Sequence, residues 1–168
     1  MRWELLFADL ESRLEAEERA EVEAEIAKRT RDERAAVTLA GRLAAHAGGR
    51  VALVLRGGGR VAGAVADLAG AWVLLDTAEG QAVVPLTAVA ALDGLGHGSA
   101  PLTEVRRRLT LASALRELAD SGLPVAVETD GGTWRGVIRA VGADHLDLDA
   151  GGVARTVPLG ALLAVRAG

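Results

Sequence analysis

The most constraining feature of this chain is an internal repeat. Residues 51–93 align without a gap on residues 124–166, a constant shift of 73 positions. The matched positions include Val54 with Val127, Gly63 with Gly136, and Val84-Pro85-Leu86 with Val157-Pro158-Leu159. Because the glycines and the proline recur where a backbone needs them, the match predicts two copies of one structural unit.

Each copy is typical of several short strands separated by turns. In the first copy the strands are expected at residues 51–56, 60–68, 71–76, 82–84 and 86–92. Gly63 and Gly136 lie inside the second strand of each copy, where glycine commonly marks a bend. We therefore expect a mostly β fold with added α: two tandem five-stranded barrels, each preceded by a helix.

The first part of the chain is different, because 15 of the 24 residues from Glu11 to Arg34 are charged. Acidic residues come first and basic residues last, which suits the dipole of a helix. Thr30-Arg31-Asp32-Glu33 has the form of a capping box, so a second helix can start there and end at Gly48-Gly49. Whether this segment is one helix or two stays open.

These patterns divide the chain into five parts. They are a charged N-terminal helical segment at 1–49, a first barrel at 50–93, a Gly-rich linker at 94–101, a helix at 102–122 and a second barrel at 123–168. Leu109-Thr110-Leu111 and Leu115 match Val37-Thr38-Leu39 and Leu43 at a shift of 72, so each unit is expected to be a helix followed by a barrel.

The order of these elements resembles the Sm-like fold, a small SH3-like barrel fold that includes bacterial Hfq. The resemblance covers residues 109–166 and 37–93, and it lies in the helix, Val125-Ala126-Val127, the Gly-Gly turn, the bent strand, Gly142 to Leu148 and Val157-Pro158-Leu159. It implies rings formed by edge pairing of strands, and RNA binding on the ring surface. Hfq has Tyr-Lys-His where this chain has Pro85-Leu86-Thr87 and Pro158-Leu159-Gly160, and the eukaryotic Arg-Gly signature is missing.

The opening residues, Met1 to Glu11, are similar to the start of a group of actinobacterial proteins, some of which carry the label of Fis-type transcription regulators. That function needs a helix-turn-helix, and the sequence has no pattern for one.

Composition narrows the function classes. The absence of cysteine excludes disulfides, thiolate metal sites and a cysteine nucleophile. A net charge of −4 argues mildly against a protein that coats nucleic acid. No basic region followed by an apolar stretch opens the chain, so we expect a cytoplasmic protein without membrane association.

Three motifs have both a functional and an ordinary interpretation. Arg106, Arg107 and Arg108 are weak candidates for nucleic-acid contact, or simply a solvated helix face. His145, Asp147 and Asp149 alternate along one strand, as metal ligands or as a solvated strand face. The Gly57-Gly58-Gly59 run is a phosphate loop or, as we expect, a hairpin turn. No catalytic triad or cofactor fingerprint appears, so we assign no catalytic residue, cofactor or metal.

Comparison of the two copies identifies a candidate interface. If Val54 and Val73 face the first core, then Leu53, Leu55, Trp72 and Leu74 point to the opposite side, and all are apolar. Their counterparts at the shift of 73 are Ala126, Glu128, His145 and Asp147. An apolar patch of this size rarely stays exposed, so we expect the N-terminal helices, the second barrel or another subunit to cover it.

These observations predict a non-catalytic interaction or scaffold protein that self-associates through barrel edges or through the N-terminal helix, which is also a candidate site for a protein partner. A dimer is favoured, and a pseudo-hexamer of three chains is an alternative. The second hypothesis is an Sm-type RNA-binding regulator, and an enzyme of unknown type is the third.

Overall fold

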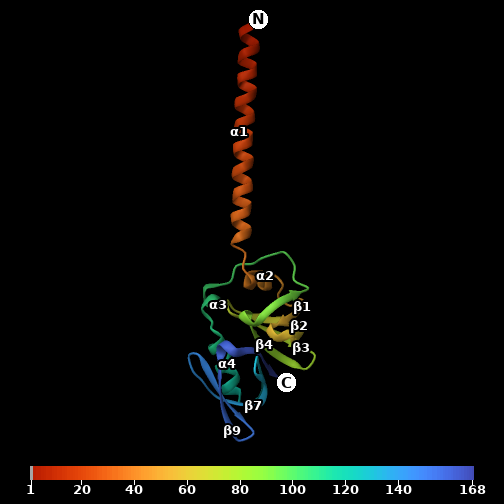
Figure 1. The fold of residues 1–168 in the computed structure, drawn as a ribbon, viewed down its shortest axis with the longest axis vertical. Coiled ribbons are helices and arrows are strands. Elements are labelled where there is room, and N and C mark those ends of the chain that lie inside the picture. Colours follow the sequence, from red (N-terminus) through yellow and green to blue (C-terminus); the bar gives the residue numbers. More distant parts are fainter. Residues whose placement is uncertain (1) are drawn as a thin grey trace. The chain divides into compact units, whose positions relative to one another are not determined.

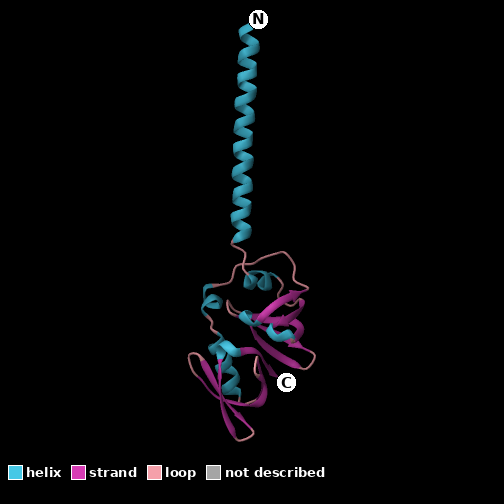
Figure 2. Ribbon diagram, viewed as in Figure 1, coloured by secondary structure: helices cyan, strands magenta, loops and turns pink. Residues whose placement is uncertain are grey.

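The computed structural model describes residues 2–168, with side chains from Asp9 onward, and the chain divides into two compact units at Val37/Thr38. The helices are α1 (Arg2–Ala35), α2 (Leu39–Ala45), α3 (Glu104–Arg108) and α4 (Leu111–Ser121) (Figures 1 and 2). The first copy of the repeat forms β1 (Arg50–Leu55), β2 (Arg60–Leu68), β3 (Trp72–Thr77), β4 (Gly80–Pro85) and β5 (Val89–Asp93). The second forms β6 (Pro124–Thr129), β7 (Gly132–Val141), β8 (His145–Ala150), β9 (Val153–Pro158) and β10 (Leu162–Ala167).

The N-terminal helix runs unbroken through the expected capping box, which corrects that prediction. The Thr30 hydroxyl donates to the Ile26 carbonyl at 2.9 Å, so Thr30 lies inside α1. The second helix starts eight residues later, where the Thr38 hydroxyl accepts a hydrogen bond from the Gly41 amide at 3.0 Å. Leu43 of α2 is fully buried in the first core, so α2 belongs with residues 38–168 and not with the N-terminal segment.

The helix expected at residues 102–122 is also two helices. α3 ends at Arg108, and Thr110 caps α4 by accepting from the Ser113 amide at 3.1 Å. Two threonines, Thr103 and Thr110, each start a helix here, because a threonine hydroxyl satisfies an amide that has no partner in the first turn.

All ten strands form one antiparallel sheet, in the order β5-β1-β2-β3-β4-β10-β6-β7-β8-β9. Each copy therefore keeps the same internal order, with its last strand next to its first. Strand β4 of the first copy pairs with β10 of the second instead of closing on β5. The expectation of two separately closed barrels is corrected accordingly: the strand pairing describes a single open sheet that ends at β5 and β9.

The first strand of the two copies is shifted by one residue relative to the ungapped alignment. Val51 of β1 pairs with Gly63, whereas Val125 of β6 pairs with Gly136, so the structural shift is 74 there and 73 from the second strand onward. The extra residue lies in the turn after β1, a 3-10 turn at Arg56–Gly58 in which Gly57 and Gly58 have positive φ. The glycine run is therefore a hairpin turn, as expected.

This shift overturns part of the candidate interface. Leu53 and Leu55 are at most 1% exposed and lie in the first core, because a slip of one residue moves every side chain of a strand to the opposite face. Val54, expected in the core, is the half-buried residue between them.

The two cores are joined by strand β10. The first core gathers residues of β1 to β4 with Leu43 of α2, and the second gathers residues of β6 to β10 with Leu115 of α4. Leu163 and Ala164 of β10 pack into the first core, while Leu162 and Val165 pack into the second. Strand β10 thus contributes side chains to the cores of both halves of the sheet.

In the part of the chain that the structure describes, no helix combines the length and the low polarity that crossing a bilayer requires.

Candidate interaction surfaces

The junction between the two copies is the pairing of β4 with β10. Val83 lies opposite Val165, Ala82 opposite Arg166, and Gln81 opposite Ala167. At Gly80, where φ is +118°, a Cβ would lie 2.4 Å from the Ala167 carbonyl oxygen, so only glycine lets the last strand approach this closely. The junction is therefore a specific contact for which the sequence of the first copy is adapted.

Polar contacts hold the same junction at its borders. The Arg166 guanidinium contacts the Glu128 carboxylate and donates to the Arg60 carbonyl at 3.3 Å. In the 3-10 turn after β1, Arg56 donates to the Gly160 carbonyl at 3.3 Å. Two arginines, one from each copy, therefore reach into the other copy.

Helix α4 covers the outer face of the first copy. Trp72, which is 7% exposed, packs with Val83 and Ala69, and the half-buried residues Leu74, Leu111, Ala114 and Leu118 lie against them. Trp72 and Leu74 were expected beneath another element, and the structure places them beneath the helix that precedes the second copy.

A groove of about 360 Å³ remains between this face and α4, lined mainly by apolar side chains that include Trp72, Leu74, Val83 and Leu118. The Trp72 indole nitrogen is buried and has no hydrogen-bond partner among residues 2–168. The cover is apolar and is supplied by the same chain.

The outer face of the second copy is polar. His145, Asp147 and Thr156 occupy the positions that Trp72, Leu74 and Val83 occupy in the first copy. The Thr156 hydroxyl donates to the Asp147 carboxylate at 2.6 Å. Within residues 38–168, these side chains join no hydrophobic cluster with a helix, whereas Trp72 and Val83 form one with α4.

Two carboxylates on this face are held in their charged form. A hydrogen bond of 2.8 Å joins the His145 ring to the Asp144 carboxylate, and it lowers the pKa of Asp144 and raises the pKa of His145. The pKa of Asp149 is lowered chiefly by its hydrogen bond from Arg139 at 2.8 Å and also by the Gly152 amide at 2.9 Å. His145, Asp147 and Asp149 thus each have a partner in the chain.

The described residues contain no group of three or more His, Asp or Glu side chains that could hold a metal ion. The alternating residues of β8 therefore do not converge, even though they share one face of the strand.

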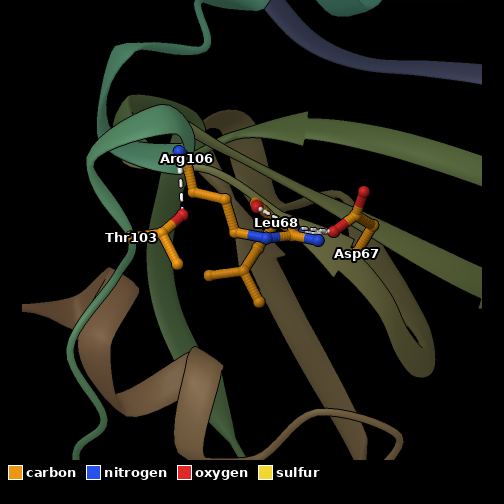
Figure 3. Close-up of polar contacts among 4 residues, drawn as sticks. All are labelled: Asp67, Leu68, Thr103 and Arg106. Carbon is orange, nitrogen blue, oxygen red and sulfur yellow. Dashed lines mark hydrogen bonds and ion pairs between the residues drawn. The ribbon is translucent and has the colours of Figure 1, made fainter.

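The arginine triplet is engaged within the chain. Arg106 of α3 forms an ion pair with Asp67 and donates to the Leu68 carbonyl at 2.7 Å, and its own amide donates to the Thr103 hydroxyl (Figure 3). Arg107 and Arg108 both pair with Glu104, at 2.7 and 2.9 Å. Arg106 thus fixes α3 to the end of β2, and Arg107 and Arg108 share one carboxylate, which offsets one of their two charges.

Two strand edges remain without a partner in residues 2–168. Strand β9 pairs only with β8, and β5 pairs only with β1. Ala90 and Ala91 of β5 are exposed, whereas their equivalents on β10, Leu163 and Ala164, are buried in the first core. The free edge of β5 thus presents small apolar residues at positions that the paired edge of β10 buries.

On β9, the notable residue is Arg155, which the sequence interpretation did not single out. Its guanidinium lies 4.7 Å from the centroid of the Trp134 ring, and its Nε atom is buried without a hydrogen-bond partner in the described chain. The alignment of the two copies could have identified Arg155, because it replaces Ala82, a core residue of the first copy.

Helix α1 exposes a second kind of apolar surface. Leu10, Leu14, Val22 and Ile26 are each more than half exposed, and they follow one another at steps of four residues on either side of Glu18. Ion pairs between residues four apart, such as Arg19 with Glu15 at 3.0 Å, stabilise the helix itself.

No protein-family model matches this chain, and no curated protein sequence matches it.

Proposed function

We propose that this chain is a non-catalytic, cytoplasmic scaffold protein with two Sm-like units, and that it self-associates through the free edges of its sheet. The observation that supports this most directly is the β4–β10 junction. It shows how the last strand of one unit pairs with the fourth strand of another, and the repeat places the same two strand types, β5 and β9, at the free ends.

Association of this kind is heterologous, because the β9 edge of one copy meets the β5 edge of the next. Such contacts form closed rings when the rotation between copies closes, and open chains when it does not. A ring of three chains would hold six units, and a dimer would hold four.

The apolar side chains that remain exposed also support a role in protein interactions. The first outer face is covered inside the chain, while the free β5 edge and the aliphatic side chains of α1 remain exposed. Exposed strand edges are templates for pairing unless charge, proline or a covering element blocks them.

The test is the mass of the full chain in solution. Light scattering coupled to gel filtration, from low to high micromolar concentration, should give a multiple of 17.3 kDa. Ala91→Lys, which places a charge on the β5 edge, should reduce the mass towards that of one chain. Ala62→Lys changes an equally exposed alanine on the internal strand β2 and should leave the mass unchanged.

A strictly monomeric wild-type chain at high micromolar concentration would contradict the proposal. Repeating the measurement after nuclease treatment separates self-association from assembly on co-purified RNA, the second hypothesis.

A further inference from the structure

The β4–β10 junction shows which residues lie opposite each other when these two strands pair. Because the repeat aligns β5 with β10 and β9 with β4, it predicts the residues that would lie opposite each other if β5 and β9 of two copies paired. The repeat places Leu92, Asp93 and Gly94 where β10 has Val165, Arg166 and Ala167, and it places Thr156, Arg155 and Ala154 where β4 has Val83, Ala82 and Gln81. The equivalence holds in the structure, since Asp93 pairs with Ala52 as Arg166 pairs with Ala126. A second copy docked in this register would place its Asp93 directly opposite Arg155. Val153 stands where β4 has Gly80, so the two edges must separate beyond Ala154.

The two side chains have complementary charge and suitable surroundings. Arg155 is a half-buried cation for which the described chain supplies no carboxylate, and its Nε atom has no hydrogen-bond partner. Asp93 is exposed, and its contact with Arg60 at 3.2 Å is a surface pair with both side chains more than 60% exposed, which contributes little. Asp93 can therefore exchange partners at low cost.

The helix that covers the junction gives a second, independent match. Inside the chain, Ala114 and Leu118 of α4 lie against Trp72 and Leu74. At the shift of 72 set by the two threonine caps, Arg42 of α2 and the C-cap residue His46 stand in place of Ala114 and Leu118. The Arg42 guanidinium donates to the Gly96 carbonyl at 2.7 Å and pairs with no carboxylate of the described residues. The face that α2 of a second copy would meet carries Asp147 in place of Leu74. Opposite charges thus replace an apolar contact on both sides at once.

We propose that copies of this chain join through an electrostatic counterpart of the internal junction, in which Arg155 of β9 pairs with Asp93 of β5 in the next copy and Asp147 faces Arg42 of that copy. This inference rests on the proposed self-association. It adds which residues of the two strand edges lie opposite each other and that ion pairs hold them together. The internal junction lies within one chain and pairs Val83 with Val165 between polar borders, whereas the junction between copies depends on ion pairs and therefore on salt, since ions screen exposed pairs.

Charge reversal tests the pairing. Arg155→Asp and Asp93→Arg should each weaken association by about tenfold or more, because each places like charges opposite one another. Mixing the two variants should restore association, since each then finds its complement in the other. Arg135→Asp, which reverses an exposed arginine of β7 away from both edges, is the matched control.

Sedimentation velocity at low and high salt gives the readout, with far-UV circular dichroism to check folding. Wild-type association that weakens at high salt and is lost in each variant but regained in the mixture supports the inference. A wild-type chain that associates equally in both salts, with variants that do the same, overturns it while leaving the proposed self-association standing. A monomeric wild-type chain overturns both.

A cross-link decides the matter if a charge reversal unfolds the chain. The protein has no cysteine, so Leu92→Cys combined with Thr156→Cys introduces a single pair that this register places opposite each other between copies. Oxidation should give covalent oligomers on a non-reducing gel. Ala90→Cys with Thr156→Cys lies two residues out of register and should not, and equal cross-linking of both pairs would overturn the register.

Discussion

At the scale of single residues, two glycines decide how closely the strands approach. A Cβ at Gly136 would lie 2.0 Å from the Asp149 carbonyl oxygen, and one at Gly63 would lie 2.3 Å from that of Asp76. Gly63 and Gly136 are not among the glycines with a positive φ. Glycine is therefore required at these two positions because a side chain has no space, and not because of the backbone conformation. The sequence identified both positions, but the reason is the neighbouring backbone and not a bend alone.

Gly136→Val, and even Gly136→Ala, should therefore lower the free energy of unfolding by about 1 to 3 kcal/mol, the usual cost of forcing extra atoms into a packed site. Denaturant titration measures the effect. Gly160→Ala is the control, because nothing lies within 4 Å of a Cβ there. Equal stability of the Gly136 and Gly160 variants would contradict this explanation.

A second residue-scale prediction concerns His145. Its hydrogen bond with Asp144 raises the pKa above the ordinary 6.5, and the charge of Asp147 adds to the shift. The stabilising contribution of this pair is fully present between pH 3.8 and pH 6.5. It is lost as the pH rises through the raised pKa of His145, and also as the pH falls through the lowered pKa of Asp144. Asp144→Asn should return the pKa towards 6.5 in an NMR titration of the ring protons, whereas Asp120→Asn on α4 should not. An unchanged titration in Asp144→Asn would count against the pair.

At the scale of elements, the two outer faces are the clearest contrast between the copies. Trp72→His with Leu74→Asp, which copies the second face into the first, should destabilise the chain strongly. Each buried large apolar side chain contributes about 1.5 to 3 kcal/mol, and the new carboxylate would lie against α4. Thermal or chemical unfolding measures the loss.

The reciprocal change, His145→Trp with Asp147→Leu, should leave the unfolding free energy nearly unchanged, because within residues 38–168 these two side chains pack in no hydrophobic cluster with a helix. It should instead promote non-specific association, since it exposes an apolar patch. Equal tolerance of both exchanges would show that the two faces are equivalent.

At the scale of the whole molecule, the core is confined to one of the two units. Every described buried hydrophobic side chain lies at Ala40 or beyond. Removal of residues 2–35 should therefore leave the melting temperature of the remainder unchanged, and edge-mediated association should persist. A truncated chain that loses its oligomeric mass would instead assign the association to α1 and its four exposed aliphatic residues.

The sequence by itself determined the repeat, the ten strands and the contrast between Trp72-Leu74 and His145-Asp147, because these depend on local pattern and on comparison of aligned positions. It misplaced Leu53 and Leu55, because one extra residue in a glycine turn reverses the faces of a strand and leaves no mark in an ungapped alignment. It also placed a helix start at Thr30, since a capping box fits equally well inside a continuing helix.

Only the tertiary structure decided which strands meet. The β4–β10 pairing brings together residues about 80 positions apart through backbone hydrogen bonds, and any exposed strand edge offers the same groups, so sequence pattern does not select the partner. The cover of Trp72 by α4 and the buried, partnerless Nε of Arg155 were likewise decided by the tertiary structure, because burial is a property of the assembled sheet and not of a residue's own sequence.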